Sequence, residues 1–138
     1  MKKRESTSEV VFHHAAFSGD VSAEEVRQWH LARGFSDIGY HFVVRRNGSF
    51  ELGRDINLRG AHDLKKNHKS IGILICGDFS KEVPTTAQLK MAANLFRVMK
   101  QKYGNHLKPV YHRSREEENP CPGLKFPREY FNRLLAEQ

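Results

Sequence analysis

The sequence predicts a single α/β domain with a mixed central β-sheet flanked by helices. Short apolar runs typical of strands alternate with longer segments whose apolar residues recur at helical spacing. The segment 70–76, SIGILIC, is apolar almost throughout, which indicates a central strand covered on both faces. At 138 residues the chain has the length of one domain with its own hydrophobic core.

Strands are expected at 10–13, 40–44, 49–52, 70–76 and 110–112. Asn47-Gly48 lies between the second and third of these runs and predicts a tight hairpin turn.

Three helices are expected. Capping-box sequences at 22–25 (SAEE) and 85–88 (TTAQ) each mark a helix start, and Gly34 and Gly104 mark the ends of these helices. We interpret Trp29 as the core anchor of the first helix. A third helix should begin at Pro127 and run toward Leu135. The second helix is the longest, and its predicted buried stripe is Leu89, Ala92, Ala93, Phe96, Met99 and Tyr103.

Residues 1–8 are polar and predict a flexible arm before a domain at 9–138. They have a basic start without a following apolar run, so we expect neither a secretory signal nor a transmembrane segment. The net charge of +7 favours an acidic partner, such as a bacterial envelope. Because basic and acidic residues are interspersed without a recognised binding motif, direct binding of nucleic acid is not expected.

Three potential metal ligands lie on separate segments: His13, His112 and Cys121. Imidazole and thiolate are ligands that zinc prefers, and three protein ligands leave a fourth position open, as in catalytic zinc sites. Spacing alone is equally compatible with two ordinary hydrogen-bonded histidines and an unligated thiol. Cys76 lies in the apolar strand and is read as a small buried hydrophobic residue.

Four segments, in the same order, resemble zinc-dependent N-acetylmuramoyl-L-alanine amidases. They are FHHAAF, RQWHLARGFSDIGYHFVVRRNGSFELGRD, GAHDLKKNHKSIGILICGDF and HRSREEENPCPG. This superfamily includes phage lysozymes of the amidase type and peptidoglycan recognition proteins. The resemblance extends from about Glu9 over nearly the whole chain.

The resemblance implies hydrolysis of the amide between N-acetylmuramic acid and L-alanine in bacterial peptidoglycan. It implies a zinc ion held by His13, His112 and Cys121, with Tyr40 as the catalytic tyrosine. A bound zinc would polarise the scissile carbonyl and activate a water, while Tyr40 would hold that water or donate a proton.

One position departs from the family pattern. Asn119 stands where the phage enzymes carry a catalytic lysine, and the loop before Cys121 is one residue longer than usual. Asn119 can donate a hydrogen bond but brings no positive charge, so Glu118 or Arg115 could take over part of the role.

Other residues match positions around the substrate cleft of the family. His62 and Asn67 are therefore expected to bind substrate, and His14 could support the neighbouring ligand. Four arginines could meet stem-peptide carboxylates or could form an ordinary basic surface: Arg45, Arg46, Arg54 and Arg59.

The resemblance also sets expectations for biology. A phage endolysin without a signal sequence would accumulate in the host cytoplasm and reach the cell wall through a holin or after lysis. Some phage lysozymes of this type also bind and inhibit the phage RNA polymerase, so such a partner is an alternative. A module that binds peptidoglycan without cutting it is the other alternative.

Overall fold

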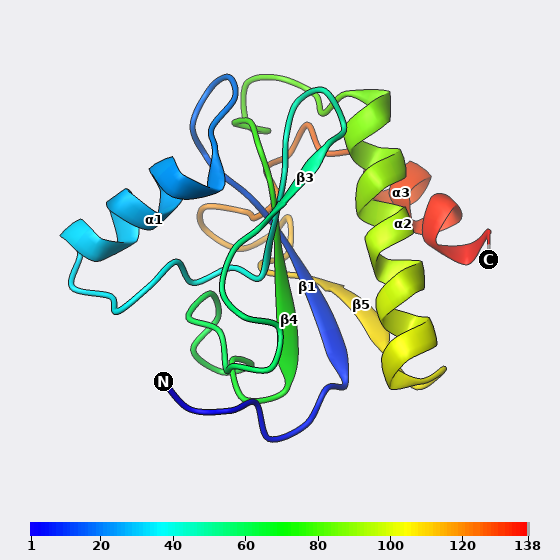
Figure 1. Cartoon of the computed structure of the whole chain (residues 1–138). Helices are drawn as coiled ribbons and strands as arrows, with labels where there is room; N and C mark the ends of the chain where they lie inside the picture. Colours follow the sequence, from blue (N-terminus) through cyan, green and yellow to red (C-terminus); the bar gives the residue numbers. More distant parts are fainter. Residues whose placement is uncertain (138) are drawn as a thin grey trace.

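The computed structural model describes residues 1–137 and confirms the predicted α/β class. Five strands form one sheet in the order β3-β2-β4-β1-β5, and three helices surround it (Figure 1). The elements, in chain order, are β1 (Glu9–His14), α1 (Ala23–Ala32), β2 (Phe42–Val44), β3 (Phe50–Leu52), β4 (Ser70–Ile75), α2 (Thr86–Tyr103), β5 (Lys108–Tyr111) and α3 (Arg128–Ala136).

The sheet is mixed because a parallel core carries one antiparallel edge strand. β1 pairs in parallel with β4 and β5, and β2 pairs in parallel with β4. Only β3, joined to β2 by the predicted Asn47-Gly48 turn, runs antiparallel. The four parallel strands therefore bring their carboxyl ends to the same edge of the sheet, which is where ligands bind in open α/β sheets.

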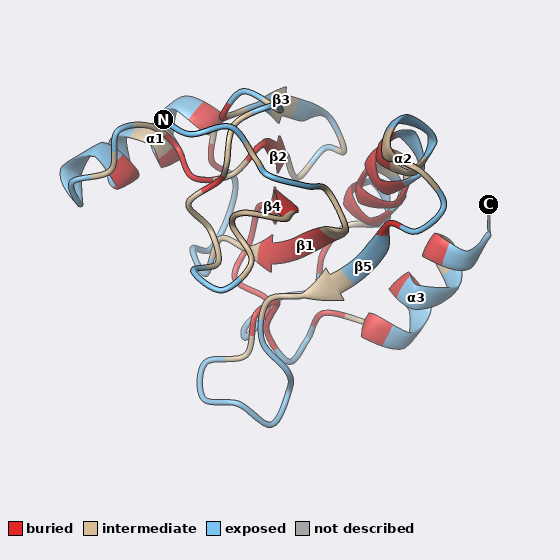
Figure 2. Cartoon of the chain, turned by 90° about the horizontal axis from the view of Figure 1, so that it is seen from below, coloured by how far each residue is buried: buried red, intermediate tan, exposed pale blue. Residues whose placement is uncertain are grey.

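The two faces of the sheet carry separate hydrophobic cores. α2 and α3 cover one face and α1 covers the other (Figures 1 and 2). Along β1, Val10 and Phe12 belong to the larger core under α2 and α3. On the neighbouring strands, Val43 of β2 and Leu74 of β4 belong to the smaller core under α1, and Leu74 is the partner of His13 in the sheet. This alternation follows from the two-residue period of a strand, and it places His13 on the α1 face of the sheet.

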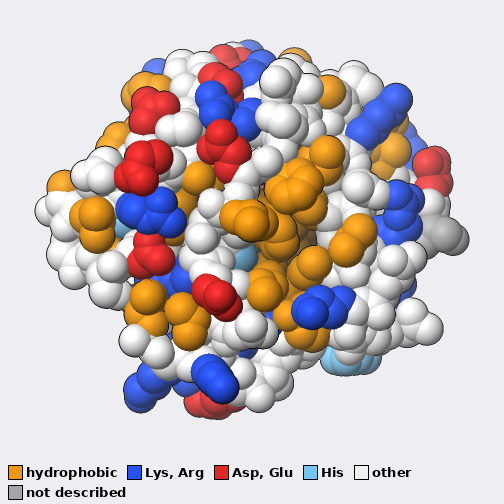
Figure 3. Space-filling model, viewed as in Figure 1, with side chains coloured by type: hydrophobic (Ala, Val, Ile, Leu, Met, Phe, Trp, Pro, Cys, Tyr) orange, Lys and Arg blue, Asp and Glu red, His pale blue; other side chains and the backbone are white. Residues whose placement is uncertain are grey.

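Strand β4 lies at the centre of this arrangement. All six of its residues are buried, as expected for a strand covered on both faces. The edge strand β3 is much less covered, since Phe50 is 43% exposed and Leu52 is 72% exposed. In Figure 3, apolar side chains gather over β3 and toward α2.

Both predicted capping boxes are present. Ser22 accepts a hydrogen bond from the backbone of Glu25, and the Glu25 side chain accepts one in return. Thr85 and Gln88 make the same reciprocal pair at the start of α2. These bonds satisfy backbone N–H groups that a helix start leaves free.

The prediction that Trp29 anchors α1 in the core is wrong. Its side chain is 37% exposed and packs instead against the exposed ring of Phe17, with 5.2 Å between ring centroids. The buried residues of this short helix are Ala23, Val26 and His30, whose three- and four-residue spacing defines a narrow face. Trp29 lies at the border of that face and stays partly exposed, because position on the helix rather than side-chain size decides which residues are buried.

Residues 1–8 lie against the domain. Lys3 forms an isolated antiparallel bridge with Leu58, and the Arg4 guanidinium donates to the carbonyl of Ile56 and to the hydroxyl of Tyr103. The flexibility expected for this segment stays a prediction. None of the helices in residues 1–137 is long and apolar enough to cross a membrane.

Candidate metal centre

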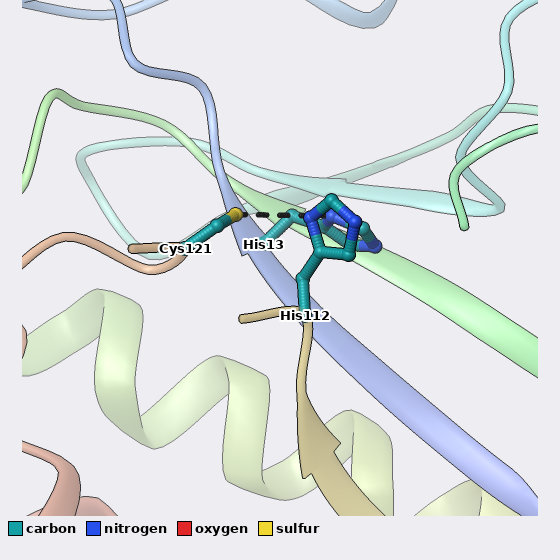
Figure 4. A group of neighbouring side chains, drawn as sticks. All are labelled: His13, His112 and Cys121. Atoms are coloured by element: carbon teal, nitrogen blue, oxygen red, sulfur yellow. Dashed lines mark hydrogen bonds between the residues drawn. The ribbon is translucent and has the colours of Figure 1, made fainter. Parts of the chain in front are cut away.

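His13, His112 and Cys121 come together at the carboxyl edge of the sheet (Figure 4). One ligand atom from each residue lies within 4.8 Å of the other two. β1 and β5 are parallel neighbours in which Phe12 pairs with Tyr111. His13 and His112 each follow directly along their strands, so the register of the sheet sets the two imidazoles beside each other, with 4.5 Å between ring centroids.

A returning loop brings the third ligand to the same place. Arg113 and Cys121 form an antiparallel bridge, in which the backbone N–H of Arg113 donates to the carbonyl of Cys121 over 2.8 Å. The loop therefore closes on itself, and the Cys121 sulfur lies 3.9 Å from Nδ1 of His13. The sequence separation of nine positions between His112 and Cys121 is bridged by this closure.

The geometry and chemistry of the three donors fit zinc. Ligand atoms about 2.0–2.3 Å from a tetrahedral ion lie roughly 3.5 Å from one another, so the observed separations need only a small inward movement. Two imidazoles and one thiol are a donor set found in zinc sites. Both cysteines are free and buried, and Cys76 lies on β4's continuation, where its thiol donates to the carbonyl of Val21.

Burial shapes the protonation of the ligands. Desolvation holds the pKa of His13 well below its usual range, and the charges of His62 and His112 act in the same direction. His13 is therefore neutral at pH 7, as a metal ligand must be. Burial also raises the pKa of the Cys121 thiol to about 11. The thiolate thus requires a nearby cation, which a bound metal would provide.

A cleft of about 730 Å³ opens beside the three donors. Four residues predicted for the site line it: Tyr40, His62, Asn67 and His112. The structure also adds charged residues that the sequence did not single out. Arg33, Lys65 and Arg113 bring positive charge to the lining, while Asp63 and Glu117 bring negative charge. Only the adjacency of Arg113 to His112 could have indicated its position from the sequence.

The Tyr40 ring packs against the candidate ligand His13, with 5.0 Å between ring centroids. Burial raises the pKa of Tyr40 above its ordinary value. Its phenol therefore stays protonated at neutral pH and is available as a hydrogen-bond donor beside the metal centre.

His62 and Asn67 have different partners. Nδ1 of His62 lies 2.9 Å from Nε2 of His13, in direct hydrogen-bond contact with a candidate ligand. The Asn67 side-chain oxygen accepts from the backbone N–H groups of His62 and Asp63, each over 2.9 Å. Asn67 therefore holds the loop that presents His62. Their predicted contacts with substrate stay predictions.

Asn119 lies in an exposed loop and is absent from the described lining of the cleft. Its backbone has a positive φ of 54°, and its carbonyl accepts a hydrogen bond from Arg113. The predicted substitutes point elsewhere, since Arg115 pairs with Glu129 and Glu118 is exposed outside the cleft. A catalytic role for Asn119 stays a prediction.

The four arginines considered for substrate carboxylates make structural contacts and do not line the cleft. Arg45 forms ion pairs with Asp20 and Glu51, and Arg59 pairs with Glu5. The remaining two bond within the domain: Arg46 to Gln88, and the buried Arg54 to backbone carbonyls.

His14 also has a structural partner. Its Nδ1 accepts the backbone N–H of Phe79 over 3.0 Å. This bond ties the end of β1 to the segment after β4, next to the metal centre.

The mixed sheet, the His-His-Cys group and the cleft together are compatible with a metal-dependent hydrolase domain. Residues 3–124 match the N-acetylmuramoyl-L-alanine amidase family, and the chain belongs to that family. Its enzyme class is therefore N-acetylmuramoyl-L-alanine amidase, as the resemblance predicted.

The chain is similar to an endolysin, to a peptidoglycan-recognition protein and to a solved amidase structure. The endolysin of Escherichia phage T7 is 34% identical over 131 residues, which cover 90% of this chain and 87% of the relative. The peptidoglycan-recognition protein LB of Drosophila melanogaster is 38% identical over 123 residues, covering 84% of this chain and 47% of that protein. The solved structure of the amidase LysC from Clostridium intestinale superposes with a TM-score of 0.85 at 30% identity, covering 98% of this chain and 89% of the other.

Proposed function

We propose that this chain is a zinc-dependent phage endolysin that cuts the amide between N-acetylmuramic acid and L-alanine in bacterial peptidoglycan. The observation that carries the proposal is the approach of His13, His112 and Cys121 within 4.8 Å beside an open cleft. Family membership supports the bond that is cut, and the phage endolysin relatives support the biological role.

The three donors would hold the metal and leave its open side toward the cleft. A zinc ion held there supplies a Lewis acid for the scissile carbonyl and a water activated at neutral pH. His112 lines the cleft, whereas His13 and Cys121 are buried behind it. Substrate therefore approaches from the side of His112 and Tyr40.

Tyr40 acts as a donor in this proposal. Its pKa is raised by burial, so its phenol keeps its proton at the pH where the enzyme works. The phenol O–H donates to the negative charge that develops on the carbonyl oxygen as the amide is attacked. Its packing against His13 holds the donor in place.

Arg113 supplies the positive charge that Asn119 does not bring. Arg113 lines the cleft, and its positive charge acts on all three groups: it adds to the burial that lowers the pKa of His13, and it opposes the burial that raises the pKa values of Tyr40 and Cys121. A cation that acts on all three groups also stabilises negative charge developing between them. We assign this electrostatic role to Arg113 rather than to Arg115, which is paired with Glu129.

The proposal is tested with purified protein by measuring zinc content and turnover of purified peptidoglycan. Active protein should carry one zinc and release free L-alanine amino groups without new reducing sugar ends. Cys121→Ser should lose both the zinc and the activity. Cys76→Ser is a matched control, because Cys76 is also buried and its replacement can still donate to the Val21 carbonyl. New reducing ends would identify a glycosidase and overturn the assignment.

The same assay separates the enzyme from a module that binds peptidoglycan without cutting it. Such a module would retain binding and show no turnover with zinc present. The other predicted partner, a phage RNA polymerase, draws no support from the described residues or from the relatives. As for an endolysin, we propose synthesis in the host cytoplasm and action at the cell wall after release.

A further inference from the structure

We infer that His62 is a positioning residue that fixes the ring orientation and the tautomer of the candidate ligand His13. It does so through a chain of hydrogen bonds that ends on a backbone carbonyl. This inference rests on the proposed zinc site, and it gives His62 a role different from the substrate contact expected from the sequence.

The donors and acceptors in this series of hydrogen bonds can be assigned by starting from Ser70. The hydroxyl of Ser70 donates to the carbonyl of Lys66 over 2.7 Å, so its oxygen is free to accept. Nε2 of His62 lies 3.3 Å from that oxygen and therefore donates to it. A neutral His62 with its hydrogen on Nε2 has an unprotonated Nδ1, which can only accept.

Nδ1 of His62 faces Nε2 of His13 at 2.9 Å, so His13 must carry its hydrogen on Nε2. Its other nitrogen, Nδ1, is then unprotonated and faces the sulfur of Cys121 at 3.9 Å. This is the tautomer that presents a lone pair to a metal between His13 and Cys121. Metal-ligating histidines commonly receive such support from a hydrogen bond at the second nitrogen.

The His62 ring is also held rigidly by its packing. A Cβ atom added at Gly72 would lie 2.6 Å from two ring atoms of His62, and one added at Gly60 would lie 2.6 Å from its Cδ2. The ring therefore rests directly on the backbone of the central strand β4. Asn67 holds the backbone of His62 from the other side.

Both ring nitrogens of His62 take part in this series of hydrogen bonds. Nδ1 is bonded to His13 and Nε2 to Ser70, so neither remains for a substrate group. His62 is one of the residues that line the cleft, but neither of its ring nitrogens is left to bind a ligand there. Since both nitrogens already have partners, His62 is better suited to orient His13 than to bind substrate directly.

The test uses zinc binding by the full chain, measured by competition with a chromophoric chelator. His62→Phe keeps a ring but no acceptor, and we expect the zinc dissociation constant to rise about 10- to 100-fold. His62→Asn places an amide oxygen near the position of Nδ1 and should restore affinity close to that of the unmodified chain. Ser70→Ala should give a smaller rise.

Ser8→Ala is the matched control for Ser70→Ala. Its hydroxyl also donates to a backbone carbonyl of the same loop, that of Lys69, but it lies outside the chain to His13. We expect its zinc affinity to be unchanged.

A second readout needs no metal. Imidazole ¹⁵N spectra of metal-free protein should show His13 with its hydrogen on Nε2 in the unmodified chain and in His62→Asn. In His62→Phe the two tautomers of His13 should mix. If His62→Phe does not fold, His62→Asn and Ser70→Ala carry the same comparison.

Three results would overturn the inference. In the first, folded His62→Phe binds zinc as tightly as the unmodified chain and only its KM is raised, which would show that His62 contacts substrate. Another is equal zinc affinity in Ser70→Ala and Ser8→Ala. The third is a His13 tautomer that ignores the substitutions. If the unmodified chain fails to bind zinc, the proposed function falls, while the spectra still decide whether His62 sets the tautomer.

Discussion

At the scale of single residues, the candidate site combines buried donor atoms with charged residues that line the cleft, Arg113 among them. His13 and Cys121 are almost fully buried, at 1% and 6% exposure, whereas Arg113 lies on the surface of the cleft. Buried groups have fixed geometry and strongly shifted pKa values, and an exposed charge acts more weakly because solvent screens it. The expected mutational effects differ accordingly.

Tyr40→Phe removes only the phenol hydroxyl, which we propose donates to the developing charge. We expect kcat to fall about 100-fold or more while zinc content stays at that of the unmodified chain. The check is turnover of peptidoglycan together with metal analysis. Tyr111→Phe is the matched control, since its hydroxyl bonds to Asn132 of α3, which does not line the cleft. A fully active Tyr40→Phe would contradict the assigned role.

Arg113→Gln removes the positive charge at the cleft. A lost donor at a reacting centre typically costs about 100-fold, and screening at an exposed position should reduce this to roughly tenfold in kcat. Arg115→Gln, which loses a surface pair with Glu129, should leave kcat unchanged. Asn119→Lys should restore part of the rate in the Arg113→Gln background. Equal rates for Arg113→Gln and Arg115→Gln would remove the role given to Arg113.

At the scale of elements, local interactions set where each helix begins and which residues of neighbouring strands pair. The capping boxes fix where α1 and α2 begin, and the pairing of β1 with β5 fixes which residues meet at the carboxyl edge. A strand shifted by one residue would turn His13 to the other face of the sheet. The site therefore depends on strand register as much as on the ligands themselves.

Thr85→Ala tests the start of α2. It removes the N-cap bond to Gln88 and the bond from the Thr85 hydroxyl to the carbonyl of Arg46. We expect the free energy of unfolding to fall by about 1–2 kcal/mol, measured by urea denaturation. Thr86→Ala, at the exposed first position of the same helix, should change it little. Equal losses in both variants would show that the cap is not the cause.

At the scale of the whole molecule, buried histidines make stability depend on pH. His41 is 1% exposed, donates from Nε2 to the Leu58 carbonyl and accepts the Gly72 N–H at Nδ1. Burial lowers its pKa from 6.5 to about 4. Between these values the unfolded chain binds a proton that the folded chain does not, so stability rises with pH across this window.

His41→Gln should remove this part of the pH dependence. From pH 7 to pH 4.5 the unmodified chain should lose about 2–3 kcal/mol more unfolding free energy than the variant does, as a shift of this size requires. The measurement is urea denaturation of metal-free protein at both pH values. His106→Gln, at an exposed position, should behave like the unmodified chain. An equal loss in His41→Gln would place the acid sensitivity elsewhere.

The sequence by itself determined the fold class, the strands and helices, and the three metal-ligand candidates. Local patterns carry this information: alternation for strands, capping boxes for helix starts, and residue types that zinc prefers. The resemblance to amidases added the bond that is cut and the importance of Tyr40. The family comparison confirms the enzyme class.

Only the tertiary structure decided which side chains are in contact with one another. It exposed Trp29, placed Arg113 rather than Asn119 on the cleft, and bonded His62 to His13. These contacts join segments far apart in the chain, and their closeness depends on strand register and loop closure rather than on local pattern. The residue types were readable in the sequence, and their hydrogen-bond partners became fixed only when the chain packed.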